Sequence, residues 1–454
     1  MSTSQPWRWI PTLYFAQGLP YVVVMTLSVV MYKNLGVSNT LIALYTSWLY
    51  LPWVIKPLWS PLVDLVGAKR RWIVLLQFAI GVAFALVALT LPAPKFLQLT
   101  LAMFWLMAFA SATHDIAADG FYMLALQQRT QAAFVGVRST FYRLSMLGGQ
   151  GGLVYLAGWL TERQGSAVLA WSWVFGLLAA VFAAAALLHL WTLPRPPSDL
   201  PAPRRAGGAA AFWHDFAAVF AAFFAKRDIV RILAFLLLYR FAEAQLLKLV
   251  TPFLLDARDV GGLGLRTQDV GIAYGTVGVV ALTLGGLLGG WVIAQGGLKR
   301  LLWPLMICMH APNLLFVLLA LLQPQSVAWI SAALAVEQFG YGFGFTAYMV
   351  FMLMVASSGG EDGQSPVHQT AHYALCTGFM ALGMMLPGMW AGWLQDRLGY
   401  VDFFIWGCVA TIPSFIAAAL VRIDPQFGRR SVAPGSADGA GSPKSSGSAG
   451  STSG

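Results

Sequence analysis

The sequence predicts an all-α polytopic membrane protein whose twelve transmembrane helices form two six-helix bundles with pseudo-two-fold symmetry. Composition is the first observation: 58% of the 454 residues are hydrophobic and only 10% are charged, whereas about a quarter of the residues of a soluble domain are charged. The second observation is a series of apolar runs of roughly 20 residues, each long enough to cross a bilayer. The third is the return of short motifs of the first half of the chain in the second half.

Each apolar run is expected to be helical, because backbone amides in lipid must find hydrogen bonds within their own segment. The twelve expected spans are residues 10–32, 38–62, 72–92, 97–125, 131–158, 168–193, 229–256, 268–292, 301–323, 326–357, 366–392 and 400–422. They divide the chain into an N-terminal bundle (1–193) and a C-terminal bundle (229–422). Residues 194–228 are expected to be a linker with an amphipathic surface helix, and residues 423–454 a disordered tail rich in Ala, Gly and Ser.

Basic side chains predict the orientation of the chain. They concentrate in one set of loops, at 69–71, 204–205, 226–227, 299–300 and 429–430, and are sparse in the loops on the other side. By the positive-inside rule, both termini are expected to be cytoplasmic. Because loop charges of this kind account for the net charge of +10, that charge does not predict a nucleic-acid partner.

Three motif pairs relate the two halves of the chain. GWLTERQG at 158–165 returns as GWLQDRLG at 392–399, and FAQ at 15–17 returns as FAE at 241–243. The third pair sets Ser60, Gly67, Lys69 and Arg70 against Gly290, Gly297, Lys299 and Arg300. The common order indicates a parallel 6+6 repeat, an arrangement in which transporters place the substrate site at the midplane between the halves.

Acidic residues inside the spans are candidates for proton coupling. A charge at the centre of a span costs roughly 2.5–3.5 kcal/mol, so it normally faces the bundle interior or a water-filled cavity. Asp115 and Asp119 are four residues apart and therefore share one helix face, while Glu243 and Glu337 lie deep in spans seven and ten. For each of the four, a static role as a cap, a salt bridge or a satisfied core acid is the alternative.

Basic and polar residues inside the spans are candidates for substrate binding. An arginine in the membrane stays charged and needs a partner; Asp115 and Asp119 are the nearest in sequence for the arginines of span five, and Arg240 can pair with Glu243. Lys56 either attracts an anionic substrate or extends towards the interface. The full set is Gln17, Lys56, Arg138, Tyr142, Arg143, Arg240 and His372. The three cysteines occur singly, so neither a metal site nor a cofactor is expected.

Several of these segments resemble the AmpG family of major facilitator permeases, which belongs to a wider group with acetyl-CoA transporters and siderophore importers. The resemblance rests on FAQGLP at 15–20, KPLWSPLVD at 56–64, KRRW at 69–72, SATHDIAADG at 111–120 and YRLSM at 142–146. The loop with Asp64, Lys69 and Arg70 is similar to the general facilitator motif between spans two and three, and it is expected to act as a gating loop. It departs from that motif in having Ser60 for the leading glycine and Leu65 for a basic residue.

The resemblance implies a substrate, a driving force and a location. The cargo would be N-acetylglucosaminyl-1,6-anhydro-N-acetylmuramic acid, with or without its peptide, imported across the bacterial inner membrane by proton symport for peptidoglycan recycling and β-lactamase induction. Asp115, Asp119 and Arg143 would match the family's buried polar residues, and Lys56 and Asp64 its span-two motif. The partners would be the small-molecule cargo, protons and the lipid bilayer, and the carrier would be a monomer.

Other functions remain open at the level of sequence. A carrier of the same superfamily with another cargo, such as a siderophore or an acyl-CoA-like anion, fits the same spans. A membrane-embedded lipid enzyme would use His114, Asp115 and Asp119 to hold a metal, and a sensor would use the permease fold without transport. The 6+6 repeat favours a carrier over both.

Overall fold

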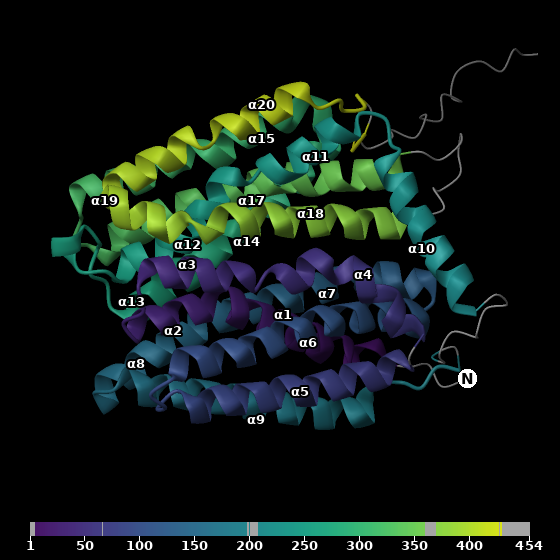
Figure 1. Cartoon of the computed structure of the whole chain (residues 1–454), viewed down its shortest axis with the longest axis horizontal. Helices are drawn as coiled ribbons and strands as arrows, with labels where there is room; N and C mark the ends of the chain where they lie inside the picture. The colour runs from purple at the N-terminus through teal and green to yellow at the C-terminus, as the bar shows by residue number, and fades with distance from the viewer. Residues whose placement is uncertain are drawn as a thin grey trace, which may run out of the picture.

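The computed structural model describes residues 5–65, 67–197, 199, 208–358, 369–425 and 427–428. Within these ranges the chain forms helices joined by turns and contains no β-strand, which confirms the all-α class. Figure 1 shows two layers of roughly parallel helices, the first half of the chain (purple to blue) below the second half (green to yellow). The expected disordered tail lies almost entirely outside the described residues.

The N-terminal bundle contains six helical segments, three of them interrupted. Its α-helices are α1 (Ile10–Val22), α2 (Ser28–Asn34), α3 (Asn39–Trp48), α4 (Leu51–Leu65), α5 (Lys69–Thr90), α6 (Phe96–Ala125), α7 (Gln128–Met146), α8 (Val154–Gln164) and α9 (Ala167–Thr192). π-helical turns join α1 to α2 (η2, Val23–Leu27) and α7 to α8 (η3, Leu147–Leu153). π-Turns of this kind often mark functional sites.

The C-terminal bundle follows the same plan. Its α-helices are α11 (Ile229–Leu238), α12 (Phe241–Leu255), α13 (Thr267–Val270), α14 (Val279–Gly296), α15 (Leu298–His310), α16 (Leu314–Leu322), α17 (Val327–Ser357), α18 (Gln369–Met389), α19 (Ala391–Val409) and α20 (Ile412–Leu420). A π-helical segment, η5 (Gly271–Gly278), joins α13 to α14. The chain reverses inside α19 at Gly399, whose φ of 75° favours glycine.

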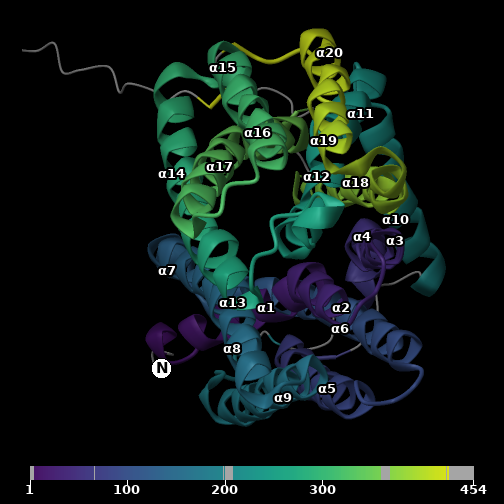
Figure 2. The ribbon, with the colours of Figure 1, turned by 90° about the vertical axis from the view of Figure 1, so that its left-hand side faces the viewer.

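The two ends of the bundles differ. The N-terminus, helix α10 (Gly208–Phe224) and the end of α20 lie at one end, on the right in Figure 1, which we call the terminal end. The linker contains α10, and Phe223 of this helix is buried against the ring of Phe379. The turn between α12 and α13 lies at the opposite end, which faces the viewer in Figure 2.

Apolar side chains fill each bundle and also coat its outside. Fully buried aromatic residues such as Phe84, Phe104 and Phe182 form the core of the N-terminal bundle. Outward-facing residues such as Trp191, Leu89 and Trp329 are more than 70% exposed. Eight helical stretches in the described ranges are long and apolar enough to cross a membrane. An apolar exterior of this kind suits lipid, and the chain is a multi-pass membrane protein.

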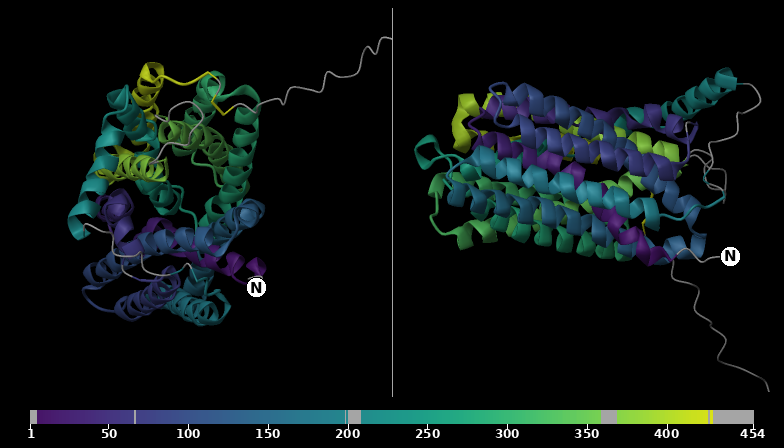
Figure 3. Two further views of the ribbon diagram at one scale, coloured as in Figure 1. Left: turned by 90° about the vertical axis from the view of Figure 1, so that its right-hand side faces the viewer. Right: turned by 90° about the horizontal axis from the view of Figure 1, so that it is seen from below.

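The bundles meet closely at the opposite end. There α3 packs on α19 and α8 packs on α13, and Ala43 of α3 lies fully buried in a cluster formed by side chains of the C-terminal bundle. Figure 3 shows the helices of both bundles end-on from the terminal end and lengthwise from below; in both bundles they run in roughly the same direction. Because the bundles touch closely at the opposite end, there is room for a cavity between them towards the terminal end.

Candidate functional site

A cavity of about 760 Å³ lies between the bundles. The cavity is lined by α4 and α6 of the N-terminal bundle and by α18 of the C-terminal bundle. It extends from Arg240, at the break between α11 and α12, to Lys69 and Thr370 at the ends of their helices. The cavity therefore reaches the terminal end of the molecule. Its lining residues are Tyr21, Tyr50, Trp53, Lys56, Pro57, Ser60, Lys69, Ile116, Asp119, Gly120, Met123, Leu124, Arg240, Thr370, Tyr373, Ala374, Thr377, Met380, Ala381 and Met384.

Asp119 presents its carboxylate to this cavity from α6. Its Oδ1 lies 3.0 Å from Nη2 of Arg138 on α7 and accepts a hydrogen bond of 3.3 Å from the Tyr14 hydroxyl. The Arg138 guanidinium also lies over the ring of Tyr14, 4.6 Å from its centre. The side chains of the pair remain 38% and 34% exposed, so the pair can exchange protons and water with the cavity. One of the two expected pairings of a span-five arginine is thus present.

Asp115 lies one turn earlier on α6 and pairs with Lys56. Its Oδ2 lies 3.5 Å from the Lys56 Nζ and accepts a hydrogen bond of 3.4 Å from the Trp53 indole. Lys56 therefore stays beside the cavity and does not extend to the interface. The two carboxylates that the sequence placed on one face each have a cation of their own.

His114 faces away from these carboxylates, into the N-terminal bundle. Its Nε2 lies 3.1 Å from the Gln77 amide nitrogen, the Gln77 oxygen lies 2.8 Å from Nδ1 of His189, and Nε2 of His189 lies 3.0 Å from the Thr12 hydroxyl. Gln77 and His189 are fully buried. The described residues contain no cluster of three or more metal-ligating side chains, so they do not support the metal site that a lipid enzyme would need.

The expected pairing of Arg240 with Glu243 is wrong. Arg240 lies in the break between α11 and α12, where its φ of −110° and ψ of 20° are not helical, so a three-residue spacing does not place the two side chains together. The Arg240 guanidinium instead donates a hydrogen bond to the Tyr341 hydroxyl. Glu243 turns into the C-terminal bundle, where its Oε1 lies 2.9 Å from Nδ1 of the equally buried His310.

The remaining predicted residues do not line the cavity. Gln17 is buried on α1 and Glu337 on α17, where the Gln338 amide donates a 2.8 Å hydrogen bond to the Glu337 carboxylate. The backbone oxygen of Tyr142 accepts a hydrogen bond from Ser145.

Two candidate cations also turn away from the cavity. Arg143 points to the other bundle and donates a hydrogen bond of 3.3 Å to Thr283 of α14, so the aspartate partner proposed for it is wrong. His372 lies on α18, and its ring packs against that of Phe223 on α10.

The loop between α4 and α5 is held by the linker. The Asp199 carboxylate accepts hydrogen bonds from the backbone nitrogens of Lys69 and Arg70, at 2.7 and 3.1 Å, and so caps the N-terminus of α5. The Arg70 guanidinium donates to the backbone oxygens of Leu190 and Leu193 at the end of α9. The side chain of Asp64 lies outside the described residues, so its expected gating role stays a prediction.

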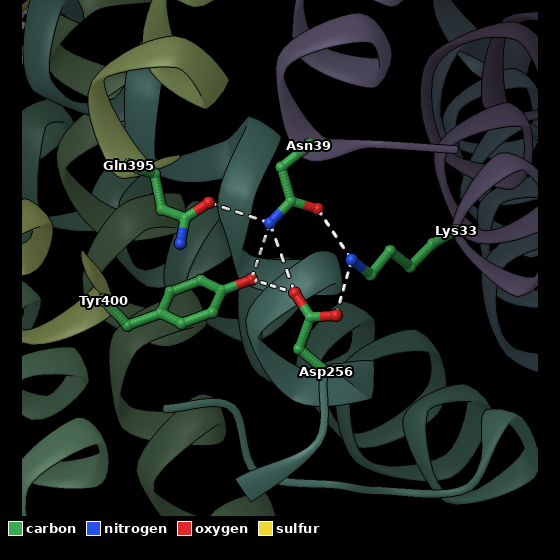
Figure 4. A network of polar contacts seen from close by, with 5 residues as sticks. All are labelled: Lys33, Asn39, Asp256, Gln395 and Tyr400. Atoms are coloured by element: carbon green, nitrogen blue, oxygen red, sulfur yellow. Dashed lines mark hydrogen bonds and ion pairs between the residues drawn. The ribbon is translucent and has the colours of Figure 1, made fainter. Parts of the chain in front are cut away.

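At the opposite end, a hydrogen-bonded network around Asp256 joins the bundles (Figure 4). The Asp256 carboxylate lies 2.5 Å from the Lys33 Nζ and accepts hydrogen bonds from the Tyr400 hydroxyl at 2.5 Å and the Asn39 amide at 3.2 Å. Asn39 also donates to Gln395 at 2.8 Å. We call these five residues the Asp256 network; Lys33 and Asn39 come from the N-terminal bundle and the other three from the C-terminal bundle.

Glycines bring the backbones together beside this network. A Cβ atom added at Gly392 would lie 2.2 Å from the backbone oxygen of Asn39, and one added at Gly158 would lie 2.4 Å from the backbone nitrogen of Gln268. These two glycines begin the repeated motif GWL at 158 and 392. The repeat therefore marks two equivalent contacts, α8 with α13 and α19 with α3, that seal the opposite end.

Sequence reasoning missed the Asp256 network and most of the aromatic wall of the cavity, which consists of Tyr21, Tyr50, Trp53 and Tyr373. Lys33 and Asp256 are separated by more than 200 residues and lie at loop ends, where neither periodicity nor a motif relates them. Tyr21 and the α18 residues that line the cavity carry no charge, and their spacing does not distinguish them from other residues of the spans. The arrangement as a whole, open at one end and sealed at the other, is that of a carrier in one of its two access states.

This fold and site define the class of the protein: it is a multi-pass membrane transporter. Residues 12–364 match the family model described as the Major Facilitator Superfamily. The chain belongs to this superfamily.

Relatives and solved structures agree with that assignment. The anhydromuropeptide permease of Escherichia coli (strain K12) is 26% identical over 92% of this chain and 80% of its own length. A protein described as putative transporter AmpG 4 of Rickettsia conorii is 24% identical over 88% of this chain and 93% of its own. A solved variant of the nucleoside transporter NupG covers 90% of this chain and 97% of that chain at a TM-score of 0.66 and 17% identity. A solved bacterial homologue of the lysosomal transporter Spinster, inward-facing and unoccupied, covers 92% and 96% at a TM-score of 0.62 and 17% identity.

Proposed function

We propose that the protein imports anhydromuropeptides, with or without their peptide, from the periplasm to the cytoplasm by proton symport across the bacterial inner membrane. The observation that carries this proposal is the similarity to the Escherichia coli permease, which extends over 92% of the chain and so includes both bundles. The cavity, with its aromatic wall and its paired carboxylates, supports a polar cargo of this kind. The imported sugar would feed peptidoglycan recycling and β-lactamase induction.

The distribution of basic residues supports an orientation with the terminal end in the cytoplasm. With that orientation, the cavity opens inward and the Asp256 network closes the periplasmic side. The carrier would work as a monomer that alternates between this state and one in which the opposite end is open. The six helices of each bundle would move largely as a rigid body.

The Asp119–Arg138 pair is the proposed coupling element. In the outward-open state a periplasmic proton would reach the Asp119 carboxylate and neutralise it. Loss of the charge removes most of the attraction across the 3.0 Å contact and lets Arg138 change its position, while release of the proton into the cytoplasm restores the pair. Each proton that moves down 100 mV supplies about 2.3 kcal/mol, enough to accumulate a neutral cargo roughly 50-fold.

Uptake of labelled anhydromuropeptide into proteoliposomes with an imposed pH gradient tests both parts of the proposal. The wild type should accumulate the cargo, and collapse of the gradient should abolish accumulation. Asp119→Asn should lose gradient-driven accumulation while it still exchanges labelled for unlabelled cargo. Asp402→Asn, at an exposed carboxylate outside the cavity, is the matched control.

Two results would count against the proposal. Uptake that is indifferent to the gradient would exclude proton symport. Absence of any anhydromuropeptide uptake, with uptake of a siderophore or an acyl-CoA-like anion instead, would leave the carrier class intact and replace the cargo.

A further inference from the structure

Arg240 is a buried cation whose charge is not balanced by any carboxylate that the structure describes. Its side chain lines the cavity, yet the residue is only 8% exposed. In the described ranges, the Tyr341 hydroxyl is its hydrogen-bond acceptor, and its buried Nε has none. The guanidinium lies 4.9 Å from the ring centre of Phe345 and 5.4 Å from that of Tyr341. Aromatic faces stabilise a cation only in part.

Four other charged side chains beside the cavity form two ion pairs. Asp119 pairs with Arg138 and Asp115 with Lys56, so these four side chains contribute no net charge. The acid nearest to Arg240 in sequence, Glu243, is directed at His310 and away from the cavity.

A lysine side chain is buried near the same end of the cavity. Lys248, on α12, is 4% exposed; its Nζ donates a 2.9 Å hydrogen bond to the Thr46 hydroxyl and lies 5.1 Å from the ring centre of Tyr50. Tyr50 lines the cavity as Arg240 does. At the closed inner end of the cavity, the Arg240 guanidinium therefore remains a positive charge that no described carboxylate neutralises.

An unneutralised guanidinium in a low-dielectric site is costly, and arginine cannot relieve the cost by losing its proton. A bound anion relieves it, and the planar fork of N–H groups matches a carboxylate in two parallel hydrogen bonds. Tyr21 and Trp53, whose rings meet edge to face at 5.3 Å, form an aromatic wall of the same cavity. A ring that carries an acid group would contact both features.

We propose that Arg240 binds a carboxylate of the transported molecule, so that the carrier selects ring-containing organic acids over neutral sugars. This inference rests on the proposed transport function and specifies the charge of its cargo. Arg240 acts as the anchor for the anion in the C-terminal bundle, while the proposed proton site, Asp119, belongs to the N-terminal bundle.

Calorimetric binding of an anhydromuropeptide and of its carboxamide derivative to the purified protein tests the anchor. The acid should bind the wild type at least about tenfold more tightly than the amide, because a charge-assisted hydrogen bond is lost in the amide. Arg240→Gln should bind both forms equally weakly, and Arg240→Lys should restore part of the preference, since it keeps the charge and loses the fork. Arg231→Gln, which removes an arginine of α11 paired with Asp228 outside the cavity, should leave the preference unchanged.

A second arm does not depend on the cargo. Thermal-shift titrations compare glucuronate with glucuronamide and benzoate with benzamide, on the wild type and on Arg240→Gln. If anhydromuropeptides fail to bind but carboxylates stabilise the wild type alone, the proposed cargo is wrong and the Arg240 site stands. If acid and amide behave alike on the wild type in both arms, or if Arg240→Gln keeps the preference for acids, the inference is overturned. The wild-type comparison is decisive even if the variant fails to fold.

Discussion

Neutralising Asp256 is expected to open the end of the molecule that is sealed in this structure. Asp256 is the centre of the Asp256 network, where it accepts from Lys33, Asn39 and Tyr400. Asp256→Asn keeps the size of the side chain and removes its charge. When the bundles separate at this end, the side chains of the network become hydrated, so the variant loses stabilisation only in the sealed state.

The size of the effect follows from the geometry of the ion pair. Two charges 4 Å apart attract by about 4 kcal/mol near a protein surface, whereas exposed pairs contribute at most about 1 kcal/mol. The Lys33 and Asp256 side chains are 16% and 17% exposed, which places the pair between these limits. A loss of about 2 kcal/mol changes the ratio of sealed to open molecules by roughly 30-fold. A ratio of about 100:1 would fall to about 3:1.

Reaction of a single cysteine with a membrane-impermeant maleimide measures this change. Ala43→Cys, in a background without the native cysteines, places the thiol at a fully buried position of the sealed contact. Because the rate follows the fraction of open molecules, which rises from about 1% to about 23%, Asp256→Asn should raise it roughly 20-fold, whereas Asp259→Asn, at an exposed neighbour, should not. The double exchange Lys33→Asp with Asp256→Lys should return the rate towards the wild-type value. An unchanged rate in a folded Asp256→Asn protein would show that the network does not hold the bundles together.

Two further predictions concern packing. Gly158→Leu introduces a Cβ atom that would lie only 2.4 Å from the backbone nitrogen of Gln268, so the sealed state should be lost and the thiol of Ala43→Cys should react faster still. If the thiol instead reacts as slowly as it does without Gly158→Leu, the sealed state does not need the close contact of α8 with α13. Gln77→Leu removes the amide between His114 and His189 and leaves one ring nitrogen of each buried imidazole without its partner, so it should cost about 2–4 kcal/mol of stability in denaturant unfolding. An unfolding curve like that of the wild type would mean that water replaces the amide.

The all-α class and the apolar character of the helices could be predicted from the sequence because lipid imposes a simple rule. Every span must satisfy its own backbone, so apolar length and loop charge suffice to locate it. The internal repeat likewise identified Gly158 and Gly392 as equivalent positions, though not the contacts they make. The breaks within spans were harder to predict from the sequence. The break at Arg240 is the reason that the predicted pairing of Arg240 with Glu243 was wrong.

The partners of the charged residues could be predicted only where both lie on neighbouring helices of one bundle. Asp119 and Arg138 satisfy this condition, because α6 and α7 are consecutive. Arg143 does not, since its partner Thr283 belongs to the other bundle. Contacts between bundles exist in one access state and break in the other. They depend on the relative position of two rigid bodies, which helix periodicity does not encode.

The two proposals together predict how uptake depends on membrane potential. A cargo that brings one negative charge to Arg240 with one proton at Asp119 crosses the membrane as a neutral unit. The potential then contributes nothing to accumulation, and the pH gradient alone drives uptake, at about 1.4 kcal/mol, or tenfold, for each unit of pH. Proteoliposomes with a potassium diffusion potential and no pH gradient should therefore fail to accumulate a monoanionic anhydromuropeptide, whereas the carboxamide derivative, if carried, should respond to the potential. Potential-driven accumulation of the monoanion would require more than one proton per cycle and would contradict a single coupling carboxylate.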